Sequence, residues 1–263
     1  MRLESALATV LTTSSQGIST NLLRKIFIPI LTAIVFFVPL SAAEEEADDS
    51  AGSDIISRYV AQTQSQESNL RGVQMDVDIN ANLPKLQKEG KLHALRHISR
   101  VGQITYQGLK FIGDNTIKND LIVRYIRAET ESQNIPEMGI TPKNYKFKYR
   151  GVYQHEGHKL YVFHITPRKK AVGLFKGELW VDAGTYLPYR ESGHFVKNPS
   201  IFLKKVEFTR DYEIRDGVAF PKHIESTIDT RFWGKAEMSI NFSNYSHDPE
   251  EHASVPTAEP LSQ

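Results

Sequence analysis

The sequence predicts a mainly β (α+β) fold, a single curved antiparallel sheet of about 9–10 strands with two or so helices on its concave side. Three observations predict it. After Gly72 apolar and polar residues alternate with a period of two, two stretches have helical spacing, and the turns contain Asp and Gly. A sheet of this width tends to curl, so helices on its concave side would give it a core.

The N-terminal segment has the pattern of an export signal. Residues 26–40 are apolar and uncharged, follow two basic residues and precede three small ones. This is the plan of a cleaved signal peptide, because a membrane-spanning helix needs about 20 apolar residues. We therefore expect a signal peptide over residues 1–43, cleavage between Ala43 and Glu44, and a periplasmic mature chain. An uncleaved membrane anchor is the alternative.

The mature chain is predicted to begin with a linker and a short helix. Residues 44–53 are acidic and small and have no apolar face, which indicates a solvated linker. Residues 54–62 place Ile55, Ile56 and Tyr59 on one helical stripe, so we expect the folded domain to begin at residue 54.

A second helix is expected to interrupt the strands. Residues 114–132 carry apolar side chains near one face, and either Asn119 or Asp120 can cap the helix. Because such a helix would lie over the sheet, its segment 119–131 is a candidate lid for whatever the sheet holds.

The remaining segments have the pattern of strands joined by tight turns. Pairs such as Asp216-Gly217 tolerate the positive φ that hairpins require, so neighbouring strands should be antiparallel. A domain over residues 54–246 follows, and residues 247–263, with three prolines and no periodicity, form a predicted disordered tail. The expected strands lie near residues 73–80, 91–100, 103–111, 146–153, 160–166, 177–182, 186–196, 205–214, 218–230 and 234–245.

Composition excludes several kinds of chemistry. The chain has 32 Lys and Arg against 31 Asp and Glu, and this net charge of +1 argues against a dedicated nucleic-acid binder. It has no cysteine, which excludes disulfides, thiolate zinc sites, iron–sulfur clusters and a cysteine nucleophile. We expect no nucleic-acid partner, no cofactor and a monomer.

No catalytic arrangement is visible in the sequence. The histidine pairs His93/His97 and His155/His158 lie in a predicted strand and beside a predicted turn, so they lack the helical framework of a zinc site. The chain also has no G-x-S-x-G elbow and no phosphate-binding glycine loop. We therefore predict that the protein is not an enzyme and that it has no metal site.

Two stretches with hairpin turns carry a family resemblance. They are ELWVDAGTYLPYRES over residues 178–192 and FTRDYEIRDGVAFPKHIE over residues 208–225. Together with the order of elements, they resemble the LolA/LolB-like outer-membrane lipoprotein-sorting (lipoprotein carrier) superfamily, which includes RseB-type amino-terminal domains. The resemblance implies an unclosed β-barrel whose concave face, lidded by helices, holds acyl chains of a lipid or lipoprotein.

The leading functional hypothesis is an exported carrier that shelters a lipid or lipoprotein acyl chain in a hydrophobic concave pocket and performs no chemistry. Aromatic residues cluster after residue 145, and apolar contact suits varied acyl chains. A dry core beneath the helices is the alternative for any one of them. The candidate pocket residues are Leu179, Val181, Val206, Phe208, Tyr212, Met238, Ile240, Phe242, Phe147 and Tyr149.

Two other functions stay open at this stage. An RseB-like envelope sensor or interaction module would bind a membrane protein as its partner. An envelope hydrolase would need two carboxylates across a cleft, and the sequence alone does not place such a pair.

Overall fold

The computed structural model describes residues 41–132, 138–198 and 202–247. The chain from Leu40 onward forms one compact unit. The predicted signal segment up to residue 40 and the predicted disordered tail from residue 248 lie outside the described residues. Among the described residues, no helix has the length and hydropathy that are needed to cross a membrane.

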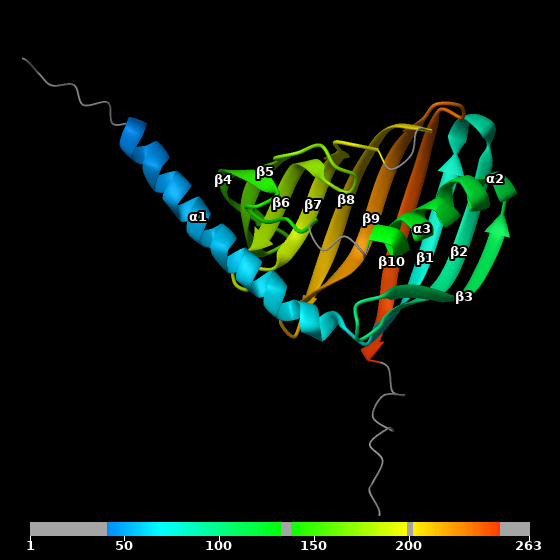
Figure 1. Ribbon diagram of the computed structural model, residues 1–263, viewed down its shortest axis with the longest axis horizontal. Coiled ribbons are helices and arrows are strands. Elements are labelled where there is room, and N and C mark those ends of the chain that lie inside the picture. Colours follow the sequence, from blue (N-terminus) through cyan, green and yellow to red (C-terminus); the bar gives the residue numbers. More distant parts are fainter. Residues whose placement is uncertain (1–40, 133–137, 199–201, 248–263) are drawn as a thin grey trace, which may run out of the picture. The chain divides into compact units, whose positions relative to one another are not determined.

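Ten antiparallel strands form one sheet with the order β3-β2-β1-β10-β9-β8-β7-β6-β5-β4, and its two edge strands do not pair with each other (Figure 1). This confirms the predicted mainly β fold with an unclosed sheet. The strands are β1 (Val73–Leu83), β2 (Lys88–Ile98), β3 (Ile104–Gly113), β4 (Tyr145–His155), β5 (His158–Pro167), β6 (Phe175–Asp182), β7 (Pro188–Phe195), β8 (Leu203–Arg215), β9 (Val218–Thr230) and β10 (Lys235–His247).

The first helix is longer than the sequence analysis predicts. Helix α1 (Ser41–Gln66) runs through residues 44–53, which were expected to be a linker, and passes into the 3-10 turn η1 (Glu67–Leu70). The acidic residues of this segment lie near the helix N-terminus, where the helix dipole favours negative charge, and alanines between them support the helical backbone. The predicted cleavage point after Ala43 falls in the first turn of α1.

The second helical stretch consists of α2 (Asn115–Ile117), the π-helical segment η3 (Lys118–Ile122) and α3 (Val123–Ser132). Its N-cap is Asp114, whose carboxylate accepts a hydrogen bond from the Thr116 backbone amide at 2.7 Å. The predicted caps at Asn119 and Asp120 were therefore wrong. The helix starts a turn earlier because Ile117 belongs to its buried stripe.

The sheet has one face covered by helices and one open face. We call these the covered face and the open face. Strand β1 shows the alternation clearly: its odd-numbered residues from Val73 to Leu83 are buried and its even-numbered residues are not. Figure 1 shows the sheet curling with α1 and α3 on its inner side. The predicted position of the helices on the concave side is confirmed.

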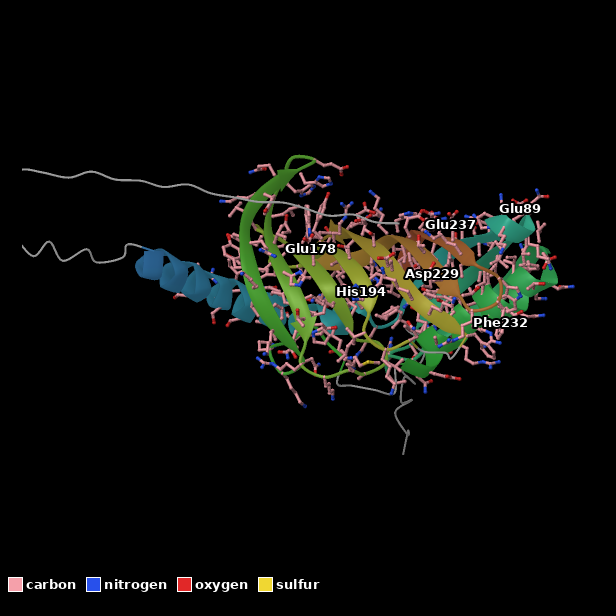
Figure 2. All side chains as sticks on the ribbon, turned by 90° about the horizontal axis from the view of Figure 1, so that it is seen from above. Glu89, Glu178, His194, Asp229, Phe232 and Glu237 are labelled. Carbon is pink, nitrogen blue, oxygen red and sulfur yellow. The ribbon has the colours of Figure 1, made fainter. Side chains whose placement is uncertain are left out.

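Polar side chains occupy the open face. In Figure 2 the labelled side chains of Glu178, His194, Asp229 and Glu237 project from this face. Each is an immediate neighbour in sequence of a residue on the covered face, as Glu178 is of the buried Leu179. This alternation fixes the register of the whole sheet, because a one-residue slip would turn every charged side chain inward.

Two apolar clusters make up the core of the covered face. The first packs the helical stretch 115–132 against β1, β2, β9 and β10, and its helical members include Ile117, Leu121 and Ile122. The second packs α1 against β4, β5, β6 and β8 through Ile55, Ile56 and Tyr59. Each helix therefore covers its own part of the sheet, and Phe195 packs against both clusters.

Strands β6 and β7 approach each other unusually closely at a pair of glycines. Gly177 faces Gly193 in the register, and a Cβ atom on Gly177 would lie 1.9 Å from the Ser192 carbonyl oxygen. We expect Gly177→Ala to lower the free energy of unfolding by about 1–3 kcal/mol, because the added methyl group has to push backbone aside. Denaturant unfolding measures this change.

The control for this prediction is Gly139→Ala. A Cβ atom there would meet its nearest neighbour, in Thr141, at 3.6 Å, which is ordinary contact. We expect a change within about 0.5 kcal/mol for this variant. Equal stabilities for the two variants would contradict the close packing of β6 on β7.

Candidate functional site

A cavity of about 270 Å³ lies between α1, the loop that precedes β4 and the covered face of the sheet. Its walls are mostly apolar, but one acidic and one basic side chain reach it. The lining residues are Tyr59, Thr63, Met138, Gly139, Ile140, Tyr145, Gly173, Phe175, Glu191, Phe195, Phe208 and Arg210. The volume lies just below the range of about 300–1,000 Å³ that is usual for small-molecule sites.

Aromatic rings form one wall of the cavity. The ring of Phe208 lies 5.0 Å from that of Phe175 and 5.1 Å from that of Phe195, measured between centroids. Three neighbouring strands, β6, β7 and β8, each supply one of these rings. Such a wall offers non-directional contact to an apolar ligand and little to a polar one.

A charged pair lies at the same wall. Glu191 on β7 and Arg210 on β8 face each other in the register, and Nη1 of Arg210 donates to Oε2 of Glu191 at 3.1 Å. The Glu191 side chain is 7% exposed, whereas the Arg210 side chain is 36% exposed and lines the cavity. Both side chains line the cavity, and the cation is the more exposed of the two.

Tyr212 completes this polar group. Its hydroxyl donates to Oε1 of Glu191 at 2.9 Å. Burial raises the pKa of Tyr212, and the Glu191 carboxylate raises it further, so the hydroxyl keeps its proton and remains a donor. Burial likewise raises the pKa of Tyr59 on α1, again with a contribution from Glu191. Both carboxylate oxygens of Glu191 thus have partners within the protein.

The hydrogen bonds of Arg210 to the described side chains leave several of its N–H donors unused. Within the described part of the chain, its guanidinium bonds to Glu191 and Tyr212 both start from Nη1. A guanidinium has five N–H donors in a planar fork that fits a carboxylate or phosphate. Nε and Nη2 can therefore serve an anionic group of a ligand in the cavity.

A second buried ion pair fastens α3 to the sheet. Arg96 on β2 donates to Oε1 of Glu129 on α3 from Nη2 at 2.8 Å and from Nε at 3.2 Å, and the Tyr106 hydroxyl of β3 donates to Oε2 of Glu129. The Arg96 side chain is 7% exposed and the Glu129 side chain 21%. Burial raises the pKa of Tyr106, and Glu129 adds to this, so the hydroxyl stays protonated as a donor.

Tyr125 on α3 connects the two polar groups electrostatically. Burial raises the pKa of its hydroxyl and Glu129 raises it further, while Arg210 and Arg96 act in the opposite direction. One tyrosine hydroxyl is therefore within electrostatic reach of the α3 ion pair and of the cation at the cavity. The covered face is not a purely apolar core.

The predicted pocket residues all lie on the covered face, but they do not share one cavity. Phe208 lines the cavity, and Tyr212 lies beside Arg210. Phe147 and Tyr149 are partly buried against the cluster under α1. The others are buried within the two apolar clusters: Leu179, Val181, Val206, Met238, Ile240 and Phe242.

Several cavity residues were missed by the sequence analysis. Tyr59 and Thr63 come from α1, and Glu191 and Arg210 come from strands that were predicted. One signal for Arg210 was present: it lies two residues after Phe208, in phase with the inward-facing positions of β8. The segment 119–131, a candidate lid, covers the other half of the face, and the cavity lies beside α1 instead.

The two histidine pairs lie near opposite edges of the sheet, one on β2 and one at the β4–β5 hairpin. His93 lies on β2, as predicted, and its Nδ1 is 3.0 Å from Oδ1 of Asp78. His155 and His158 face each other across the β4–β5 hairpin. Among the described residues no group of three or more His, Cys, Asp or Glu side chains is arranged to hold a metal ion.

Comparisons with known proteins give likeness in structure alone. No family model and no curated protein matches the chain. Similar solved structures include a LolA superfamily protein. This protein, from Nitrosomonas europaea, is 13% identical, with 74% of this chain and 93% of that chain covered and a TM-score of 0.35.

Two further structures are similar at the same level. A DUF1329 family protein from Desulfovibrio piger is 12% identical over 75% of this chain and 93% of that chain, with a TM-score of 0.42. A putative outer membrane lipoprotein-sorting protein domain from Vibrio parahaemolyticus is 13% identical over 76% and 93%, with a TM-score of 0.40. Structures of MucB, two of them in complex with MucA, are also similar, at 10% identity and a TM-score of 0.24. These scores describe a distant likeness in structure.

Proposed function

We propose that this chain is an exported periplasmic protein that shelters the acyl chain of a lipid or lipoprotein in the cavity under α1 and performs no chemistry on it. The observation that carries the proposal is the cavity of about 270 Å³ with a wall of three aromatic rings. Apolar contact there gains roughly 0.8 kcal/mol for each methylene group removed from water. A chain of several methylenes would therefore be held without any specific hydrogen bond.

The position of Arg210 indicates that the proposed ligand has an anionic or polar group at one end of its acyl chain. It is the cation of a pair whose carboxylate is already satisfied, and it reaches the cavity. An amphiphile with a carboxylate, phosphate or ester oxygen would place that group at Nε or Nη2 and its chain against Phe208. The expected cargo is therefore an acidic or ester-linked amphiphile rather than a plain hydrocarbon.

Export is supported by the N-terminal pattern. An uncharged apolar run of residues 26–40 precedes small residues, and the chain has no cysteine that could mispair in an oxidising compartment. A carrier of acyl chains is needed where such chains cross an aqueous space.

Filling the cavity tests the proposal. We expect Thr63→Trp to reduce the affinity for a fluorescent long-chain fatty acid at least tenfold, because the indole would occupy the space that the acyl chain needs. Thr63 lies on α1 and lines the cavity, so the change leaves the sheet untouched. Fluorescence titration of the purified residues 44–263 measures the affinity.

The matched control is Gln64→Trp, one residue along the same helix at an exposed position. It adds the same ring and should leave the affinity within about twofold of the parent. Unfolding curves identify any variant that has lost its fold. If the two variants bind equally well, or if the parent chain binds no fatty acid, the carrier proposal is wrong and an interaction module takes its place.

A further inference from the structure

The loops at one end of the sheet carry a group of mostly basic side chains. The loops that join β1 to β2, β5 to β6, β7 to β8 and β9 to β10 lie at this end, together with the residues just before β4. The registers establish the arrangement, since Asn82 faces Glu237, Leu203 faces Thr230, and Phe175 faces Phe195. These loops lie along the upper edge of the sheet in Figure 1. We call this the basic end.

Apart from Asp114, which follows β3 at the same end and is paired with Lys88, the described loop residues of the basic end contain seven bases and no acid. All seven are exposed, and they are distributed over five separate segments of chain: Lys85, Lys143, Arg168, Lys169, Lys170, Lys197 and Arg231. The loops at the opposite end of the sheet, residues 67–72, 99–103, 156–157, 183–187 and 216–217, contain two bases and three acids. The contrast exists although the whole chain has a net charge of only +1.

Apolar side chains are exposed among these bases. Phe232 is 69% exposed, Leu86 41%, Val172 38% and Phe202 36%. They come from four different loops, so their exposure is a shared property of this end. Large apolar side chains surrounded by bases are typical of surfaces that dock on membranes, where rings enter the headgroup region and bases meet anionic lipids.

The β9–β10 turn holds Phe232 outward. The Thr230 hydroxyl donates to the Gly234 carbonyl oxygen at 2.7 Å and accepts from the Trp233 amide at 3.0 Å, which closes the turn. The Arg231 amide donates to the Phe202 carbonyl oxygen at 2.9 Å, so the neighbouring loop is tied to the turn. The two Phe rings lie 5.9 Å apart. These hydrogen bonds therefore hold the backbone in a conformation that keeps both Phe rings at the surface.

We propose that the basic end docks on the surface of a membrane that contains anionic phospholipids, with Phe232 and Leu86 entering the headgroup region. The bases are spread over a broad end of the molecule, which suits a diffuse layer of lipid phosphates better than a single ligand. This inference is independent of the proposed carrier function, because none of the bases and exposed apolar residues named for the basic end lines the cavity. Docking at this end would leave both edge strands and the open face away from the bilayer.

Vesicle binding tests the proposal. Residues 44–263 are sedimented with vesicles of phosphatidylcholine alone or of phosphatidylcholine containing roughly one third phosphatidylglycerol. Each base near an anionic surface contributes roughly fivefold to the affinity, so Lys169→Gln with Lys170→Gln should weaken binding to the anionic vesicles about twentyfold. Phe232→Ser should weaken it further, and raised salt should weaken binding of the parent chain.

The control removes equal charge from the opposite end. Arg100→Gln with Lys159→Gln should bind anionic vesicles within about twofold of the parent. Binding that is equal for the two double variants, or equal for neutral and anionic vesicles, overturns the proposal. Absence of vesicle binding together with salt-sensitive binding to polyglutamate or to DNA also overturns it, in favour of an acidic protein or a nucleic acid as the partner.

Discussion

Replacing Glu129 with Met should lower the free energy of unfolding by about 3–5 kcal/mol, because it leaves the Arg96 guanidinium buried without its counter-charge. Arg96 is 7% exposed, so solvent cannot replace the lost carboxylate. The Tyr106 hydroxyl would lose its acceptor at the same time. With total stabilities of about 5–15 kcal/mol for typical domains, this change would be easily seen in urea unfolding.

Two further variants distinguish the loss of the buried ion pair from the effect of a Glu-to-Met change on the helix itself. Glu131→Met changes an exposed residue of the same helix in the same way and should alter stability by less than about 0.5 kcal/mol. The double variant Arg96→Met with Glu129→Met removes both charges and should recover most of the lost stability. A single Glu129→Met variant as stable as the parent would show that the ion pair does not hold α3 on the sheet.

Replacing Arg210 with Met should reduce the affinity for an acidic amphiphile roughly 10- to 100-fold while changing that for a neutral amphiphile of equal chain length by less than about threefold. The expected difference arises because Arg210 supplies the cation at the cavity and Met keeps a similar apolar volume. Isothermal titration with a fatty acid and the matching fatty alcohol measures both affinities.

The cost in stability should be of the same order as for Glu129→Met. Removing Arg210 leaves the Glu191 carboxylate, whose side chain is 7% exposed, without its counter-charge, so we expect a loss of about 3–5 kcal/mol. A suitable control is Arg215→Met, at an exposed position of the same strand, which should leave both affinities unchanged. Equal losses for the acid and the alcohol in Arg210→Met would contradict a headgroup contact at this residue.

The sheet was predictable from sequence because its signal is local. Alternation with a period of two fixes which residues lie on one strand and which share a face, as in β1, and Asp-Gly turns indicate hairpins. The extent of α1 was not predictable in this way. Its first part has no apolar stripe with helical spacing that an analysis of periodicity could detect.

The candidate site was only partly predictable, because a cavity is a tertiary feature. The alternation along its strand was enough to predict Phe208 as a pocket residue. Glu191 and Arg210 come together only through the pairing of β7 with β8. The alternation along a strand shows which of its residues share a face of the sheet, but it does not show which strand lies next to it. Likewise, Tyr59 was predicted to be part of a helical stripe, and only the packing of α1 on the sheet brings it to the cavity.

Native mass spectrometry combined with organic extraction shows whether the cavity under α1 holds an acyl chain. The chain is exported with its own N-terminal segment and purified from the periplasm without detergent. We expect a bound species at near-stoichiometric level whose extracted mass corresponds to a molecule with an acyl chain and an acidic or ester group. A clean mass of the protein alone, from a sample that is folded, would contradict it and indicate a filled core.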